Sequence, residues 1–137
     1  MINTEIREIA AEETWPVRHK VMWPDKPFEY VKIDNDADGQ HFGLFVNGRL
    51  ASIISLFIAD GDAQFRKLAT EVECQGKGYA SQLIEHVIRV AQQQRARRVW
   101  CNARANKTSF YEKFGLQKTN ETFSKGGIDF VIMELTY

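Results

Sequence analysis

The stretch that decides the fold is Gln75-Gly76-Lys77-Gly78-Tyr79-Ala80. Its two glycines are separated by one residue, so the backbone can turn tightly and approach a ligand closely. The residues that follow predict an amphipathic helix, because apolar side chains recur at helical spacing at Ala80, Leu83, Ile84, Val87, Val90 and Ala91. The free N–H groups and the positive dipole end of that helix point back at the turn. A strand, a glycine turn and a helix N-terminus together predict a cradle for an anion.

Upstream of the glycines, the sequence predicts an antiparallel meander of three strands. Residues 41–46, 50–58 and 63–73 are rich in β-branched and aromatic side chains. Asn47-Gly48 and Asp60-Gly61 separate these segments, and such pairs are strong hairpin signals. Before the meander, we predict a short edge strand over residues 5–9, a helix over residues 11–21 and a polar, acidic loop over residues 34–39. Residues 34–38 of this loop could attract a cationic amine or form a hydrated turn, and we favour the turn.

Downstream of the glycines, residues 99–103 predict a short buried strand. The helix between this strand and the meander implies a parallel, right-handed crossover. Asn106 is predicted to cap a second helix, which Gly115 stops as a left-handed residue. A terminal hairpin is predicted over residues 116–123 and 128–137. This order of elements predicts an α/β fold with a mixed, mostly antiparallel sheet flanked by helices.

Length and charge favour one domain and exclude two classes of partner. The 137 residues are 44% hydrophobic, which is enough for one sizeable core. Lysine plus arginine equals aspartate plus glutamate at 18 each, whereas proteins built to bind nucleic acid need a basic excess. No apolar run reaches the roughly 18 to 20 residues that a membrane helix needs, and the first residues lack the features of a signal peptide. We therefore expect neither a nucleic-acid partner nor a membrane.

The cysteines and histidines predict no metal site. Cys74 and Cys101 form neither a disulfide framework nor a metal-binding pattern, which fits a reduced, cytoplasmic setting. His19, His41 and His86 share no metal-like spacing. We expect His86 to be exposed, because it lies off the apolar stripe of its helix. Neither cysteine has an obvious base near it in the sequence, so nucleophilic catalysis by a thiol is not expected.

The glycine pair alone leaves two interpretations open, a phosphate loop and a plain strand-to-helix turn. Two other phosphate motifs are excluded. A Walker A loop needs Gly-x-x-x-x-Gly-Lys-Ser/Thr, and no such run exists in the chain. A dinucleotide-binding loop would follow the first strand and carry a third glycine, whereas here the pair lies mid-chain and position 81 is Ser.

Two motifs together resemble the GNAT superfamily of acyl-CoA-dependent N-acetyltransferases. The family signature Gln/Arg-x-x-Gly-x-Gly/Ala is matched by residues 75–80. A second family motif, an Asn followed by Phe-Tyr-Glu-Lys-x-Gly-Phe/Leu, is similar to the run from Asn106 through Phe110-Tyr111-Glu112-Lys113-Phe114-Gly115-Leu116. The resemblance covers nearly the whole chain, and it implies that residues 1–137 are a single N-acetyltransferase domain with splayed central strands. It further implies acetyl transfer from acetyl-CoA to a primary amine of a small molecule or peptide, by direct attack in a ternary complex.

The resemblance also assigns residues to the cosubstrate. Backbone N–H groups from Gln75 to Ala80 would hold the pyrophosphate of coenzyme A, and main-chain groups of Leu68, Ala69 and Thr70 would pair with its pantetheine arm. A basic site for its 3′-phosphate would involve Lys77, Lys107 or Lys113. The full set implied to bind acetyl-CoA is Leu68, Ala69, Thr70, Gln75, Gly76, Lys77, Gly78, Tyr79, Ala80, Ser81, Asn106, Ser109, Tyr111 and Lys113.

Three side chains are candidates for proton transfer. The family commonly uses a tyrosine at the position of Tyr111 to protonate the departing thiolate, and the alternative is that this ring only packs against the pantetheine arm. Glu71 and Glu73 lie at the end of the predicted third meander strand, where alternation places them on one face. Either could be the general base, directly or through a water. The alternatives are that both are solvated charges, or that water alone removes the proton.

Other functions remain open at this stage. A catalytically inactive acyl-CoA-binding regulatory module would keep the cradle without turnover, and an interaction domain would bind no ligand. Arg18-x-x-Val21-x-Trp23-Pro24 with Gly127-Ile128-x-x-x-x-Met133 is similar to a branch of small bacterial acetyltransferases. The identity of the acceptor cannot be read from the sequence. Dimers are common in the family, so a homodimer is left open.

Overall fold

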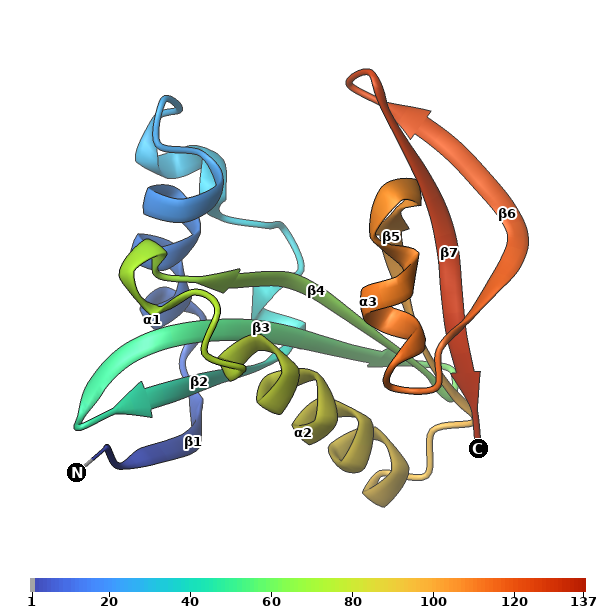
Figure 1. The fold of residues 1–137 in the computed structure, drawn as a ribbon, viewed down its shortest axis with the longest axis horizontal. Helices are drawn as coiled ribbons and strands as arrows, with labels where there is room; N and C mark the ends of the chain where they lie inside the picture. Colours follow the sequence, from blue (N-terminus) through green and yellow to red (C-terminus); the bar gives the residue numbers. More distant parts are fainter. Residues whose placement is uncertain (1) are drawn as a thin grey trace.

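The computed structural model describes residues 2–137, which form one seven-stranded sheet in the order β1-β2-β3-β4-β5-β7-β6 (Figure 1). The strands are β1 Thr4–Ile9, β2 Gln40–Val46, β3 Arg49–Ala59, β4 Asp62–Thr70, β5 Arg98–Arg104, β6 Gln117–Lys125 and β7 Ile128–Thr136. The α-helices are α1 Ala11–Val17, α2 Tyr79–Gln93 and α3 Thr108–Glu112, and a π-helical turn over Arg18–Met22 continues α1. Short 3-10 turns occupy Phe28–Val31, Asp36–Asp38, Val72–Cys74 and Ala105–Lys107. The predicted mixed, mostly antiparallel α/β fold is confirmed.

The sheet opens at its centre, between β4 and β5. These strands form the parallel pair that the crossover predicted, and their register ends at Gln64 opposite Trp100. Both strands run on, β4 to Thr70 and β5 to Arg104, with no ladder joining them. Figure 1 shows the two strands diverging from this point, with α1 on one side of the opening and α3 on the other. The predicted splay of the central strands is therefore confirmed.

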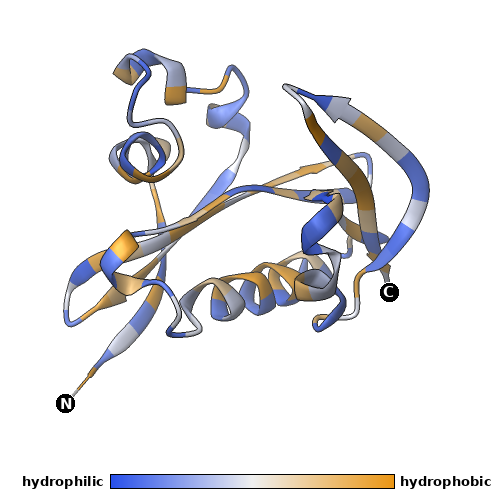
Figure 2. Cartoon of the chain, turned by 45° about the horizontal axis from the view of Figure 1, so that its top comes forward, coloured by the Kyte–Doolittle hydropathy of each residue, from blue (hydrophilic) through white to orange (hydrophobic). Residues whose placement is uncertain are grey.

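The main core lies between the sheet and α2. The apolar stripe of this helix is completely buried at Leu83, Ile84, Val87 and Ala91, and it packs against buried side chains of β2 to β5. Figure 2 shows α2 on one face of the sheet and α1 on the other. A second, small cluster of Val17, Ile53 and Ala69 fixes α1 to its face.

A buried ion pair ties the segment after α1 to the sheet. The Arg18 guanidinium, which is fully buried, donates to both carboxylate oxygens of Asp36 at 2.9 and 3.0 Å. It also donates to the Val31 carbonyl at 3.0 Å and to the Ser55 hydroxyl at 3.0 Å. Ser55 Oγ lies 2.7 Å from His41 Nδ1, and His41 Nε2 lies 2.9 Å from the Asp36 carbonyl. These partners fix the π-helical turn over the opening of the sheet.

The expectation of a hydrated turn holds for residues 34, 35, 37 and 38, which are exposed, but it is wrong for Asp36, which is buried. Burial by itself raises the pKa of the Asp36 carboxyl, but hydrogen bonds from Arg18, the Ile33 N–H and Trp15 together lower that pKa below its usual value. The carboxylate is 6% exposed, so it is a structural anion. Sequence pattern alone did not reveal this, because its side-chain partners Trp15 and Arg18 lie 21 and 18 positions away in the chain.

Four further details differ from the sequence expectations. The helix expected over residues 11–21 changes to a π-helical turn after Val17. The third meander strand ends at Thr70 rather than at residue 73, because a 3-10 turn begins at Val72. No side chain caps α3, and Asn106 lies in the 3-10 turn that precedes it. His86 is half-buried with its ring 4.9 Å from that of Phe42.

Candidate functional site

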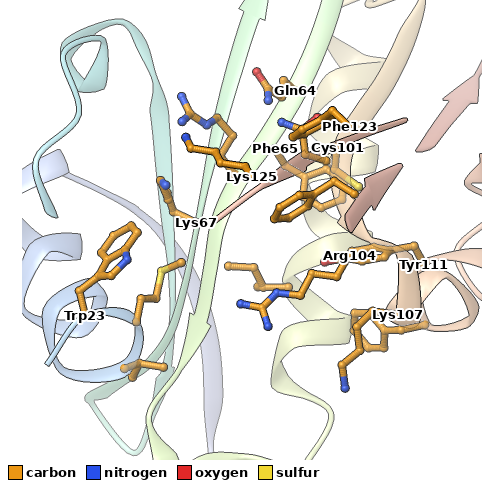
Figure 3. Close-up of a pocket in the computed structure, with 17 residues that line it drawn as sticks. Trp23, Gln64, Phe65, Lys67, Cys101, Arg104, Lys107, Tyr111, Phe123 and Lys125 are labelled. Atoms are coloured by element: carbon orange, nitrogen blue, oxygen red, sulfur yellow. The ribbon is translucent and has the colours of Figure 1, made fainter. Parts of the chain in front are cut away.

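Two adjoining cavities occupy the opening of the sheet and the glycine turn. The larger, about 690 Å³, lies in the gap between β4 and β5, and the smaller, about 400 Å³, lies over the turn and the end of β4. Val21, Leu68 and Phe110 line both, so the cavities meet. Figure 3 is a close-up of the larger cavity with its lining residues drawn as sticks. Its lining comprises Val21, Met22, Trp23, Gln64, Phe65, Arg66, Lys67, Leu68, Cys101, Asn102, Arg104, Lys107, Phe110, Tyr111, Phe123, Lys125 and Phe130.

The glycine turn has the geometry of an anion cradle. Gly76 and Gly78 adopt left-handed φ angles of +77° and +84°, which favour glycine over any residue with a Cβ. A Cβ built at either position would meet no heavy atom within 4 Å, so the turn is open to a ligand. In the first backbone hydrogen bond of α2, the Gln82 N–H donates to the Gly78 carbonyl at 3.1 Å. The N–H groups of the three residues before Gln82 therefore have no acceptor within the helix.

A β-bulge shapes the β4 wall of the larger cavity. The pairing of β3 with β4 steps from Ile53–Ala69 to Ser55–Arg66, which leaves one extra residue in β4. Within this bulge Lys67 has a left-handed φ of +58°. The bulge interrupts the alternation of side chains, and the Lys67 ammonium lies 4.7 Å from the centre of the Trp23 ring, which directly follows the π-helical turn. Lys67 therefore faces the α1 side of the opening.

Tyr111 is among the residues that line the larger cavity. Its ring is half-buried, 6.1 Å from the Phe65 ring and 5.2 Å from the Phe110 ring. Burial, helped by Cys101, raises the pKa of the Tyr111 phenol to about 12, although Arg104 opposes the shift. The phenol therefore keeps its proton throughout the neutral pH range.

Cys101, on β5, lines the same cavity but holds its proton as well. Burial raises the pKa of its thiol to about 12, and the residue is 3% exposed. Because the thiolate is the reactive form, this cysteine is not an activated nucleophile.

The two glutamates lie in different environments. The expectation that they share one face is wrong, because β4 ends at Thr70 and strand alternation stops before them. Glu71 is 8% exposed, and the Lys20 ammonium lies 3.0 Å from its Oε2. Glu71 raises the pKa of Lys20, first through their side-chain hydrogen bond and then through its opposite charge. Glu73 is exposed and lies 3.5 Å from Arg49. Neither glutamate lines either cavity.

The structure gathers most of the residues expected at the cosubstrate. The smaller cavity is lined by Leu68, Ala69, Thr70, Gln75, Gly76, Gly78, Tyr79, Ala80 and Ser81, and Tyr111 lines the larger one. Lys77, Asn106, Ser109 and Lys113 are exposed and line neither cavity. Sequence reasoning missed Arg66, Lys67 and Arg104, which line the larger cavity. The adjacent charges Arg66-Lys67 inside a strand were a signal, because a regular strand would place them on opposite faces.

Among residues 2–137, no group of three or more His, Cys, Asp or Glu side chains could hold a metal ion. No helix in the same part of the chain is long and apolar enough to cross a bilayer.

Comparison with known proteins agrees with this geometry. The family model described as an acetyltransferase (GNAT) domain matches residues 10–137. The chain is 31% identical over 133 residues to the uncharacterised N-acetyltransferase YitI of Bacillus subtilis, covering 90% of this chain and 89% of that protein.

Solved structures share the fold. A Bacillus subtilis acetyltransferase in complex with CoA superposes with a TM-score of 0.75 at 19% identity, over 100% of this chain and 99% of that one. A GNAT family acetyltransferase from Elizabethkingia anophelis with acetyl-CoA bound superposes with a TM-score of 0.78 at 16% identity, over 98% and 99% of the two chains. With the family match over residues 10–137, these findings establish that the chain belongs to the GNAT family and is an acetyltransferase.

Proposed function

We propose that residues 1–137 act as a single domain that moves an acetyl group from acetyl-CoA to a primary amine of a small molecule or peptide. The observation that carries this proposal is the continuity of the site. An open anion cradle at the start of α2 leads through shared lining residues into the gap between β4 and β5. A long molecule with a diphosphate at one end and a thioester at the other fits this path.

The cradle and the free edge of β4 have separate roles in holding the cosubstrate. The unpaired N–H groups at the start of α2 hold the pyrophosphate, and the helix dipole contributes about 0.3 to 2 kcal/mol to that interaction. Leu68, Ala69 and Thr70 line the smaller cavity beyond the point where β4 separates from β5, so their main-chain groups can pair with the pantetheine arm. A main-chain N–H there also polarises the thioester carbonyl.

The chemistry is direct attack within a ternary complex. The neutral amine forms an N–C bond to the thioester carbonyl, the C–S bond breaks, and the sulfur leaves as a thiolate. Tyr111 is the candidate proton donor, and its O–H donates a hydrogen bond to that sulfur as the negative charge develops. With a pKa of about 12 the phenol is a weaker acid than a thiol, which ordinarily titrates near 8.5. The hydrogen bond to the developing charge is therefore its main contribution.

Glu71 is the better placed of the two candidate bases. It is buried at the end of β4, and its partner Lys20 lies on the π-helical turn next to Val21, which lines both cavities. We propose that Glu71 takes the amine proton through a water. Glu73 pairs with Arg49 in solvent and has no comparable position. A route in which water alone carries the proton away is the alternative.

Two measurements on the whole chain test the proposal. The first is thermal unfolding with CoA, since ligand at a hundred times its dissociation constant adds about 2.7 kcal/mol of apparent stability. The second is release of free thiol from acetyl-CoA with a panel of amines. A shift without thiol release would identify an acyl-CoA-binding regulatory module instead. The absence of a shift would overturn the assignment of the cradle.

A further inference from the structure

The larger cavity is lined by cations without counter-charges. Arg66, Lys67, Arg104, Lys107 and Lys125 line it, and no Asp or Glu does. The whole chain carries equal numbers of acidic and basic residues, so this separation is local. Within residues 2–137, none of the five forms an ion pair with a carboxylate.

Lys67 is the most informative of these cations. Burial, and after it the nearby charges of Arg66, Arg18 and Lys125, together lower the pKa of its ammonium to about 8, and Asp36 opposes this shift. Its left-handed φ of +58° is rare for a lysine and strains the backbone. A half-buried, strained and repelled ammonium that faces a cavity is unfavourable for folding. Such a feature points to a ligand that compensates it.

The cations divide between the two sides of the opening. Figure 3 shows Lys67 and Lys125 close together, near Trp23 and away from Tyr111 and Lys107. Lys125 ends β6 at the tip of the terminal hairpin, and Arg66 lies next to Lys67 on β4. Arg104 and Lys107 come from β5 and the 3-10 turn before α3, on the Tyr111 side. The anion cradle for CoA lies at the other cavity, so its pyrophosphate does not neutralise Lys67.

We propose that the acceptor is an amine that also carries an anionic oxygen group, a carboxylate or a phosphate, and that Lys67 binds this group with Arg66 and Lys125. This inference rests on the proposed acetyl transfer and names the class of acceptor. Arginine and lysine bind such oxygens through charge-assisted hydrogen bonds. Seating the anion between these side chains would leave the amine free to face the thioester.

The test compares amines that differ only in the anionic group. O-phosphoethanolamine and ethanolamine form the first pair, which tests a phosphate. 4-Aminobutanoate and 4-aminobutanamide form the second pair, which tests a carboxylate. With saturating acetyl-CoA, kcat/KM is expected to be at least about tenfold higher for the anionic member of one pair. Raising the salt concentration should reduce this preference. Equal kcat/KM within both pairs would overturn the proposal.

Lys67→Met is the matched variant, because methionine keeps the length and apolar stem of the lysine. The preference for the anionic member should fall at least about tenfold in this variant. Lys26→Met, which removes an exposed lysine that lies 5.4 Å from the Tyr30 ring, should retain it. A preference that survives in Lys67→Met would refute the role of Lys67.

Calorimetry separates this proposal from the proposed function. If no amine turns over, O-phosphoethanolamine and ethanolamine are titrated into the CoA complex of the whole chain. Tighter binding of the phosphorylated amine, lost in Lys67→Met, supports the inference without requiring catalysis. Equal binding of the two amines overturns it while leaving the CoA site intact. Failure to form the CoA complex contradicts the proposed function instead.

Discussion

Replacing Lys67 by methionine should stabilise the free protein near neutral pH. The pKa of the ammonium falls from 10.5 to about 8, because the folded state disfavours its charge. At about 1.4 kcal/mol per pKa unit, and without solvent screening, this difference would correspond to a loss of roughly 3.4 kcal/mol in folding stability, which the substitution would recover. Lys67 is only half-buried, so solvent screening reduces the gain to about 1 to 2 kcal/mol. Loss of the contact with the Trp23 ring subtracts about 0.5 kcal/mol. We expect a net gain of about 1 kcal/mol.

The pH dependence of this gain has a definite sign. Between pH 8 and about 10.4 the unfolded chain keeps a proton on Lys67 that the folded protein has lost, so the stability of the parent protein rises with pH. The penalty from Lys67 is fully present below pH 8 and is relieved above it. The advantage of Lys67→Met should therefore fall by about half between pH 7 and pH 9.5.

Urea unfolding of Lys67→Met, the parent and the control Lys26→Met at both pH values measures the effect. The exposed Lys26 should change stability by less than about 0.5 kcal/mol. Equal stability of Lys67→Met and the parent at pH 7 would refute the reasoning, and so would a gain that does not shrink at pH 9.5. A confirmed gain means that the residue is kept at a cost in stability.

Four further changes test the site and its support. Gly78→Glu should fold, with about 1 to 2 kcal/mol of strain from the left-handed φ of +84°, but should lose affinity for CoA in calorimetry; unchanged affinity would contradict the cradle. Tyr111→Phe should lower kcat by about a hundredfold with nearly unchanged binding of acetyl-CoA, and full activity would remove its role. Glu71→Gln should lower kcat more than Glu73→Gln, measured as thiol release; equal losses would argue against Glu71 as the base. Asp36→Asn should lower the free energy of unfolding, measured in urea, by about 3 to 5 kcal/mol, because it leaves Arg18 buried without its counter-ion. In the parent protein, the stability contributed by this ion pair should be lost only as the pH falls through the lowered pKa of Asp36.

The sequence by itself determined the order of elements and the cradle, because both depend on local rules. Hairpin pairs, the apolar stripe of α2 and the glycines at 76 and 78 impose their conformations on the nearest residues. Gly115 also has the left-handed φ expected of it, at +93°. The GNAT resemblance then placed the opening between β4 and β5, which no local pattern marks.

Only the tertiary structure decided the charge of the larger cavity and the contacts that support the π-helical turn beside it. Lys67 faces the cavity because a bulge displaces it from the alternation of β4, and such a bulge forms only when β3 supplies the partner register. Asp36 is buried because Arg18, 18 positions earlier in the chain, reaches it across the fold. Glu71 and Glu73 separate because β4 ends before them. Each outcome depends on contacts between distant residues, and the spacing of residues along the chain does not encode those contacts.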